Sequence, residues 1–221
     1  AAGIGDVNGD GYTDLLVGAP RDGDHDEGAA YIFLGGPNFA DFVPNGSYAI
    51  PNGHPSFASA ADLDRHHYAD ILALNSATNT LSVQLNVGEG HFFVPRLYDT
   101  GSMPTSMAVA DFDRDGDLDV VVTCAGDDQI MFFRNDAGVL SPQGVRATGH
   151  APSSIVAGDF NKDGYPDLAV ANRDDGTVSV FMHSRRTSGT LSSLHRARVT
   201  YAAGGGPAQV VAGDFDSDGV T

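Results

Sequence analysis

Short apolar runs alternate with turn-forming polar stretches along the whole chain. Between turns rich in Gly, Asp and Asn, the apolar runs are about five residues long and contain many β-branched residues. Examples are "LLVGA" from Leu15, "VVVTC" from Val120 and "LAVAN" from Leu168. Runs of this length and composition, bounded by turn residues, are typical of β-strands. The pattern therefore predicts an all-β protein.

The apolar runs fall into groups that repeat. Four groups open just after a proline, and each proline lies seven residues before an Asp-rich stretch: Pro55, Pro104, Pro152 and Pro207. A second apolar run follows the Asp-rich stretch, then a turn, a third run such as "IMFFRN" and a more polar fourth run such as "RARVTYA". Four strands per unit of about 50 residues is the sequence sign of a β-propeller blade. A β-sandwich with a duplicated hairpin is the less favoured alternative, because a sandwich does not require the same loop in every unit.

The repeat divides the chain into units of approximately 1–54, 55–103, 104–151 and 152–206, followed by a truncated unit at 207–221. We expect one repeat domain with about four blades and part of a fifth. The sequence starts within a first strand and stops within an Asp-rich stretch. We therefore expect it to continue in a longer chain, or to be completed by self-assembly.

The Asp-rich stretch has a fixed pattern of nine residues. It reads "DVNGDGYTD" from Asp6, "DLDRHHYAD" from Asp62, "DFDRDGDLD" from Asp111, "DFNKDGYPD" from Asp159 and, cut short, "DFDSDGVT" from Asp214. Crowded carboxylates repel one another, and a divalent cation turns that repulsion into attraction. Calcium prefers six to eight oxygen ligands, and glycine at the sixth position permits a sharp turn. The pattern predicts calcium-binding loops.

We expect about three Ca²⁺ ions, in the first, third and fourth stretches. Positions 1, 3, 5 and 9 would supply side-chain oxygens, and position 7 its backbone carbonyl. The first set is Asp6, Asn8, Asp10, Tyr12 and Asp14. The third set is Asp111, Asp113, Asp115, Asp117 and Asp119. The fourth set is Asp159, Asn161, Asp163, Tyr165 and Asp167. An EF-hand is disfavoured, because its twelfth position must be Glu and is here Val17, Val122 or Val170, each in a strand-like run.

Two stretches depart from the pattern. The second has His66 and His67 at positions 5 and 6, where the others have Asp and Gly. Histidine is a poor calcium ligand, so we expect a loop that keeps its turn and binds no calcium. A transition-metal site of Asp and His is the less favoured alternative. The fifth stretch would be an incomplete site made of Asp214, Asp216 and Asp218.

The motif and its flanks resemble a known family. "GDVNGDGYTDLLVGAP" followed by "GAAYIFLGG" resembles an FG-GAP repeat of the integrin α-chain type, and "GDFNKDGYPDLAVANRDDGTVSVFMH" resembles the related VCBS-type repeats. The resemblance implies a β-propeller, commonly seven-bladed, with calcium in the loops between the first two strands of its blades. It also implies an extracellular or cell-surface location and, in integrin-like propellers, partners on the face opposite the metal loops.

On this chain, the face opposite the metal loops would be formed by the turns between second and third strands and by the connections between blades. The turns are Arg21–Gly28, Asn75–Thr80, Ala125–Gln129 and Arg173–Gly176. The connections are Pro51–Pro55, Thr100–Pro104, Thr148–Pro152 and Tyr201–Pro207.

Composition narrows the partners and the functions. The net charge of −17 argues against binding to nucleic acid or anionic membranes, and no apolar run is long enough to span a membrane. Cys124 is the only cysteine, and no nucleophile or acid–base set stands out, so we expect no enzymatic activity. The favoured function is an extracellular binding or adhesion module for a protein or glycan. The alternatives are a structural repeat of a large secreted or surface protein and, third, the accessory propeller of an enzyme.

Overall fold

A computed structural model of the chain describes residues 2–3, 6–19, 29–37, 43–49, 55–88, 91–184 and 190–214. The acidic segment Arg21–Gly28 and the candidate ligands Asp216 and Asp218 lie outside these ranges. The chain divides into two compact halves, Ala1–Thr100 and Gly101–Thr221. Each half is described separately.

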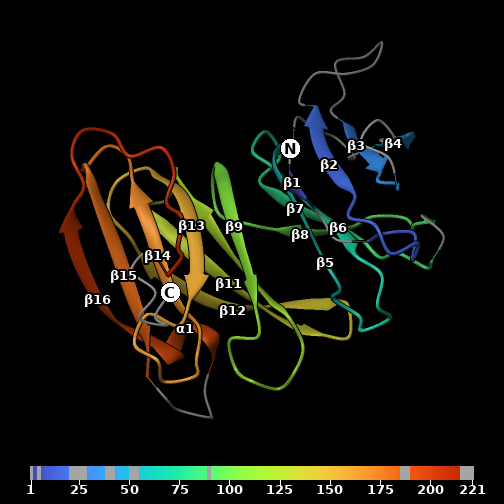
Figure 1. Cartoon of the computed structure of the whole chain (residues 1–221). Helices are drawn as coiled ribbons and strands as arrows, with labels where there is room; N and C mark the ends of the chain where they lie inside the picture. Colours follow the sequence, from blue (N-terminus) through green and yellow to red (C-terminus); the bar gives the residue numbers. More distant parts are fainter. Residues whose placement is uncertain are drawn as a thin grey trace. The chain divides into compact units, whose positions relative to one another are not determined.

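The first half contains two four-stranded sheets among its described residues (Figure 1). One sheet has the order β1-β2-β3-β4 and the other β5-β6-β7-β8. The strands of the first sheet are β1 (Ala2–Gly3), β2 (Leu15–Ala19), β3 (Ala29–Leu34) and β4 (Val43–Ala49). Those of the second are β5 (Pro55–Ala61), β6 (Asp70–Asn75), β7 (Thr80–Gln84) and β8 (Arg96–Asp99).

The second half repeats this arrangement in its described part. Its sheets have the orders β9-β10-β11-β12 and β13-β14-β15-β16. The first comprises β9 (Pro104–Ala110), β10 (Asp119–Cys124), β11 (Gln129–Asp136) and β12 (Val139–Ala147). The second comprises β13 (Pro152–Gly158), β14 (Asp167–Asn172), β15 (Thr177–His183) and β16 (His195–Ala202), with the short helix α1 (Leu191–Leu194) just before β16.

Every sheet is an antiparallel meander in which each strand pairs with the next one along the chain. The prediction of an all-β chain built from four-stranded blades is therefore confirmed. Three of the four prolines that were expected to open first strands do so, at the start of β5, β9 and β13. The fourth, Pro207, begins a segment that is described as far as residue 214 and forms no strand there. The fourth strands run along the polar edges of the sheets, and the side chains of β8 and β12 are mostly exposed.

The core of each half lies between its two sheets. In the second half, Phe112, Val121 and Phe132 pack against Leu168 and Phe181 of the next sheet. In the first half the corresponding cluster joins Leu16 and Ile32 to Ile71 and Ala73. The inner strands β6, β10 and β14 are buried along their whole length, because both faces of a central blade strand are covered.

Hydroxyl groups tie consecutive first strands together in the second half. Thr105 Oγ1 donates to the Pro152 carbonyl oxygen at 2.7 Å, and Ser153 Oγ donates to the Pro207 carbonyl oxygen at 2.8 Å. A second hydrogen bond recurs in the same way. The Ile155 amide of β13 donates to Ser106 Oγ of β9 at 3.4 Å, and the Val210 amide donates to Ser154 Oγ of β13 at 3.2 Å. Segment 207–213 therefore lies against β13 in the way that β13 lies against β9.

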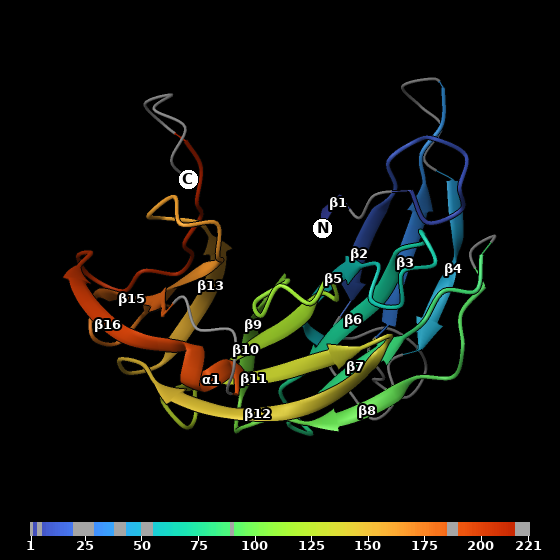
Figure 2. The same ribbon diagram turned by 90° about the horizontal axis from the view of Figure 1, so that it is seen from below.

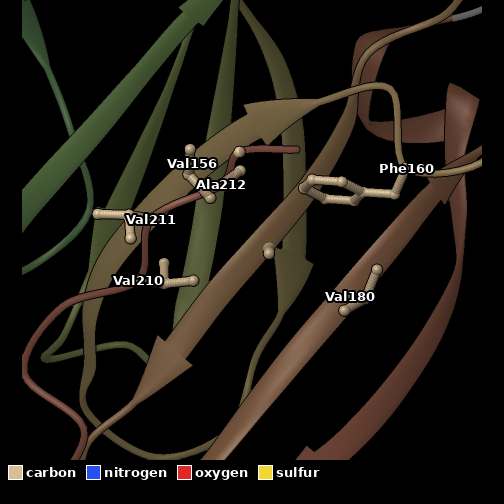
Figure 3. A pocket seen from close by; sticks show the side chains of 8 residues that line it. Val156, Phe160, Val180, Val210, Val211 and Ala212 are labelled. Carbon is tan, nitrogen blue, oxygen red and sulfur yellow. The ribbon is translucent and has the colours of Figure 1, made fainter. Parts of the chain in front are cut away.

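An apolar pocket of about 260 Å³ lies beside this segment (Figure 3). Val156, Ala169 and Val180, from β13, β14 and β15, line it together with Val210 and Val211 of segment 207–213. All eight lining residues are apolar or glycine, whereas small-molecule sites need a few polar groups that orient the ligand. The equivalent face of the preceding sheet, at Ala108, Val121 and Phe132, is packed core. We therefore interpret the pocket as part of a packing surface.

Two histidines outside the loops, His183 and His195, are buried. His183 is 5% exposed, and His195 is fully buried with its ring 5.4 Å from that of Phe112. Helix α1 covers His195: it lies beside β11 and β12 (Figure 2) and inserts Leu191 into the core. The ring of His183 stacks on Tyr165 and meets the ring of His195 edge-on. His150 and His91 are exposed.

Candidate functional site

The four complete Asp-rich stretches form loops between the first and second strands of their sheets. They are called here the first loop (Asp6–Asp14), second loop (Asp62–Asp70), third loop (Asp111–Asp119) and fourth loop (Asp159–Asp167). All four have left-handed backbone at positions 4 and 6. Position 6 is Gly11, Gly116 or Gly164 in three of them, with φ of 90°, 93° and 84°. His67 adopts the same conformation in the second loop, with φ of 68°.

The first Asp of each loop folds the loop around its own carboxylate. It accepts a hydrogen bond from the amide of position 6, five residues later. The distances from that amide to the carboxylate are 2.6 Å for Asp6, 2.8 Å for Asp62, 3.0 Å for Asp111 and 2.7 Å for Asp159. The loops therefore share one shape, because the same side-chain contact closes each of them.

The ninth residue has a second task that the sequence did not reveal. Asp14, Asp70, Asp119 and Asp167 are all fully buried. In the third loop, Asp119 Oδ2 accepts from the Phe112 amide at 3.1 Å, and Oδ1 accepts from the Asn135 amide at the end of β11 at 2.9 Å. The other three accept corresponding pairs of amide hydrogen bonds: Asp14 from Val7 and Gly35, Asp70 from Leu63 and Asn86, and Asp167 from Phe160 and His183. Each of these carboxylates joins its loop to the third strand or its end.

Burial makes these carboxylates hard to ionise. Desolvation raises the pKa of Asp119 to about 7 and that of Asp70 to about 6, despite the backbone hydrogen bonds that favour the charged form. The same cause raises the pKa of Asp14 and Asp167. A cation bound beside such a group would favour its ionised form.

The third loop brings three of its predicted calcium ligands close together. Oxygens of Asp111, Asp113 and Asp115 lie within 4.8 Å of one another. Asp111 Oδ1 is buried and has no hydrogen-bond partner among the described residues, although a buried carboxylate oxygen is costly to leave unpaired. An all-oxygen donor set with one uncommitted buried oxygen fits a hard cation such as calcium. Arg134 also reaches this loop, where its Nε lies 3.1 Å from Asp113 Oδ2 and its Nη2 2.7 Å from Asp115 Oδ2.

The first and fourth loops have Asn at position 3. Asn161 Oδ1 accepts from the Asp163 amide at 2.9 Å, and Asp163 Oδ1 accepts from the Tyr165 amide at 3.0 Å. In the first loop, Asn8 Oδ1 accepts a hydrogen bond from the Asp10 amide, and Asp10 Oδ1 accepts one from the Tyr12 amide. The predicted side-chain ligands of both loops therefore face the same turn. Tyr165 stacks on His183 at 4.4 Å, which fixes the position whose carbonyl was predicted as a ligand.

The second loop keeps the shape in spite of its histidines. Oxygens of Asp62, Asp64 and Asp70 lie within 4.8 Å of one another, as in the third loop. His66 Nδ1 lies 3.0 Å from Asp64 Oδ2, so position 5 offers an imidazole where the other loops offer a carboxylate. The non-glycine residue at position 6 does not prevent the turn. That this loop binds no calcium stays a prediction. In the fifth stretch, Asp214 is described and exposed.

The fold and these loops define a class: a β-propeller-type repeat protein with an acidic loop between the first two strands of each described blade. Profiles of the FG-GAP-like repeat match residues 62–122, 118–170 and 159–221, and a profile of the FG-GAP repeat matches residues 1–33. The chain belongs to the FG-GAP repeat family.

Among known proteins, integrin α-chains are similar to part of the chain. Integrin alpha-6 of Gallus gallus is 40% identical over 86 residues, which is 36% of this chain and 8% of that protein. Integrin alpha-8 of Mus musculus is 35% identical over 79 residues, which is 32% of this chain and 7% of that protein. The matched segments thus span less than a tenth of these relatives.

Solved structures share the fold at low sequence identity. A protein from Lactobacillus plantarum aligns with a TM-score of 0.56 and 16% identity, over 86% of this chain and 52% of that one. A protein of unknown function from Desulfotomaculum acetoxidans aligns with a TM-score of 0.52 and 17% identity, over 79% of this chain and 53% of that one. These likenesses bear on the fold alone.

Proposed function

We propose that this protein is an extracellular, calcium-stabilised β-propeller module that binds a protein or glycan partner in adhesion. The observation that carries the proposal is that one loop shape recurs in all four described blades, and that three of these loops have carboxylate or amide oxygens at positions 1, 3, 5 and 9. Membership of the FG-GAP family and the likeness to integrin α-chains support it at the level of the family.

Calcium would have a structural role in this module. The ions would be held by Asp6, Asn8, Asp10 and Asp14 in the first loop, Asp111, Asp113, Asp115 and Asp119 in the third, and Asp159, Asn161, Asp163 and Asp167 in the fourth. Backbone carbonyls of Tyr12, Asp117 and Tyr165 would complete the protein ligands. Bound calcium would neutralise carboxylates that otherwise repel one another and would hold each first strand to its second.

The partner surface would lie on the loops of the other face. In the second half, the Ser102 amide donates to Asp127 at 2.7 Å, and the Ala151 amide donates to Asp128 at 2.8 Å. The His150 amide donates to Asp175 in the next turn at 2.8 Å. These bonds join the turns after β10 and β14 to the connections before β9 and β13. A surface fixed in this way can bind a partner with little loss of loop entropy.

A binding role agrees with the chemistry of the chain. Cys124 is fully buried, and burial raises the pKa of its thiol to about 11, so it would be un-ionised and inaccessible at neutral pH. FG-GAP repeats of the integrin type are generally non-enzymatic. Within the described residues, no helix is long and apolar enough to cross a membrane.

A direct test measures binding of the calcium-loaded protein to a glycan array and to a panel of purified matrix proteins. We expect saturable binding that is lost in EGTA and weakened by Arg173→Glu, which reverses an exposed charge in the turn after β14. Lys162→Glu is the matched control, because it reverses an exposed charge in the fourth loop on the metal face. A folded, calcium-loaded protein that binds nothing on either panel would contradict the adhesion role and favour a structural repeat.

A further inference from the structure

In the third loop, an arginine from a neighbouring strand binds two of the acidic residues. Arg134 lies near the end of β11, and its guanidinium contacts Asp113 Oδ2 at 3.1 Å and Asp115 Oδ2 at 2.7 Å. The other oxygen of each carboxylate accepts a loop amide, from Asp115 at 3.2 Å and from Asp117 at 2.9 Å. Arg134 therefore occupies the outer oxygens of two predicted calcium ligands.

The position of Arg134 has an equivalent in every described sheet. Each equivalent residue immediately precedes the amide that binds the ninth Asp of its loop, and they are Leu34, Leu85 and Met182. Among these four equivalent positions, the third sheet has the cation and the other three have an apolar residue. The third loop also has Asp113 at position 3, where the first and fourth loops have the neutral Asn8 and Asn161. In the second loop the corresponding Asp64 is paired with His66 instead.

We propose that Arg134 is a built-in counter-cation that sets the calcium affinity of the third loop. It compensates the extra carboxylate of Asp113, holds the loop in its ligand geometry without an ion, and makes the third loop the readily exchanging calcium site of the module. The proposal rests on the calcium sites assigned under the proposed function.

The physical reason is a competition for the same carboxylates. With Arg134 in place, two negative charges of the metal-free loop are paired, so less repulsion is relieved when calcium arrives. Calcium must also bind beside a positive charge that is only a few ångströms away. At such distances, interactions between unit charges near a protein surface reach a few kcal/mol, which corresponds to one or two orders of magnitude in affinity. Asp111 Oδ1 stays uncommitted, so the arginine weakens the site without filling it.

The experiment uses the variant Arg134→Met, because the fourth blade has a methionine, Met182, at the equivalent position. Calcium is titrated into the metal-free protein, and its binding is followed by NMR. The amide signals of Gly11, Gly116 and Gly164 report the first, third and fourth loops separately. We expect the dissociation constant read from Gly116 to fall about tenfold, while the other two stay within about twofold. The melting temperature in EGTA should fall by several degrees, and high salt should shrink both effects.

Two further variants separate the contact from the charge. Arg114→Met removes an arginine of the same loop whose guanidinium lies over the Tyr165 ring, 4.9 Å from its centroid, and it should change the Gly116 constant by less than about threefold. Asp113→Asn combined with Arg134→Met makes the third loop resemble the first and fourth, and should restore the melting temperature in EGTA. If Arg134→Met does not fold, Arg134→Gln is measured in its place with the same expectation.

The outcomes separate this proposal from the one on which it rests. If the wild-type protein shows no calcium response at any of the three glycines, the proposed calcium function fails. If the wild type responds, but removal of Arg134 leaves the Gly116 constant unchanged or weakens binding, the counter-cation role alone is wrong. A tighter Gly116 constant with an unchanged melting temperature in EGTA would also contradict it, because the arginine would then not stabilise the metal-free loop.

Discussion

The second and third loops have nearly the same shape and a different chemistry. Both place three carboxylates within 4.8 Å, both have left-handed residues at positions 4 and 6, and both end in a fully buried Asp. Asp115 and Gly116 in the third loop are replaced by His66 and His67 in the second. One loop pairs its carboxylates with Arg134, the other pairs Asp64 with a histidine of its own.

This comparison separates what shapes a loop from what would bind an ion. The shape depends on positions 1 and 9, whose carboxylates accept hydrogen bonds from backbone amides in all four loops. Ion binding depends on positions 3 and 5 and on nearby charges. A loop can therefore lose its ion without losing its place in the blade, and the four predictions below test that separation.

The largest effect is expected from Asp119→Ala. The substitution leaves the amides of Phe112 and Asn135 buried without acceptors, at about 1–3 kcal/mol each, so the free energy of unfolding should fall by about 3–5 kcal/mol. Urea unfolding in EGTA measures the loss without any contribution from calcium. Asp136→Ala, at an exposed position of the same sheet, is the control and should change stability by less than about 0.5 kcal/mol. Equal effects would show that the ninth position does not shape the loop.

The next effect is a gain of function in the second loop. His66→Asp with His67→Gly gives it the ligands and the turn residue of the third loop, so the protein should bind one additional calcium ion. At a calcium concentration 100 times the dissociation constant, the added site should stabilise the fold by about 2.7 kcal/mol. Thermal melts with and without calcium measure this gain, and His91→Asp controls for an added carboxylate elsewhere. An unchanged ion count would mean that more than positions 5 and 6 separates the two loops.

The pH dependence of the metal-free protein should follow the buried carboxylates. Burial raises the pKa of Asp119 to about 7 and of Asp70 to about 6, so protonation stabilises the folded state. This stability is fully present below the unfolded pKa near 4 and is lost as the pH rises through 6 and 7. In EGTA, the free energy of unfolding should fall by roughly 3 kcal/mol between pH 5 and pH 7, with the larger share from Asp119. Calcium should abolish the fall, and Asp119→Asn should reduce the slope in EGTA. A stability that rises over this range in EGTA would contradict the account.

The smallest effect concerns a contact outside the loops. Thr105→Val removes the hydroxyl that donates to the Pro152 carbonyl, and should cost about 1 kcal/mol of unfolding free energy with calcium binding unchanged. Thr200→Val, at an exposed position of β16, has the same change of side chain and should be close to neutral. A loss of calcium binding in Thr105→Val would show that strand contacts and loops are not separable.

Much of this organisation could be predicted from the sequence, because the repeat makes each unit a copy of the same local pattern. β-branched runs bounded by Gly and Asp predicted the strands, and the prolines marked where β5, β9 and β13 begin. The Asp-rich pattern placed the loops between first and second strands. These features depend on local sequence, in which turn chemistry and side-chain alternation act over a few residues.

Features that depend on distant residues were not predictable in this way. Asp119 meets the Asn135 amide, and Asp113 meets Arg134, only after the sheet brings the end of β11 beside the loop. The burial of His195 was also not predictable, because no pattern in the sequence shows that α1 covers it. One sequence feature could have indicated the contact of the ninth Asp with its own loop. Position 2 is apolar in every loop, and its backbone amide donates a hydrogen bond to the buried ninth Asp.

The central claim is that the first, third and fourth loops bind calcium and the second does not. Native mass spectrometry of the metal-free protein, titrated with calcium, counts the ions directly. The account predicts three, and two for Asp115→Ala, which removes a ligand of the third loop only. A protein that binds no calcium, or a count that Asp115→Ala leaves unchanged, would contradict it.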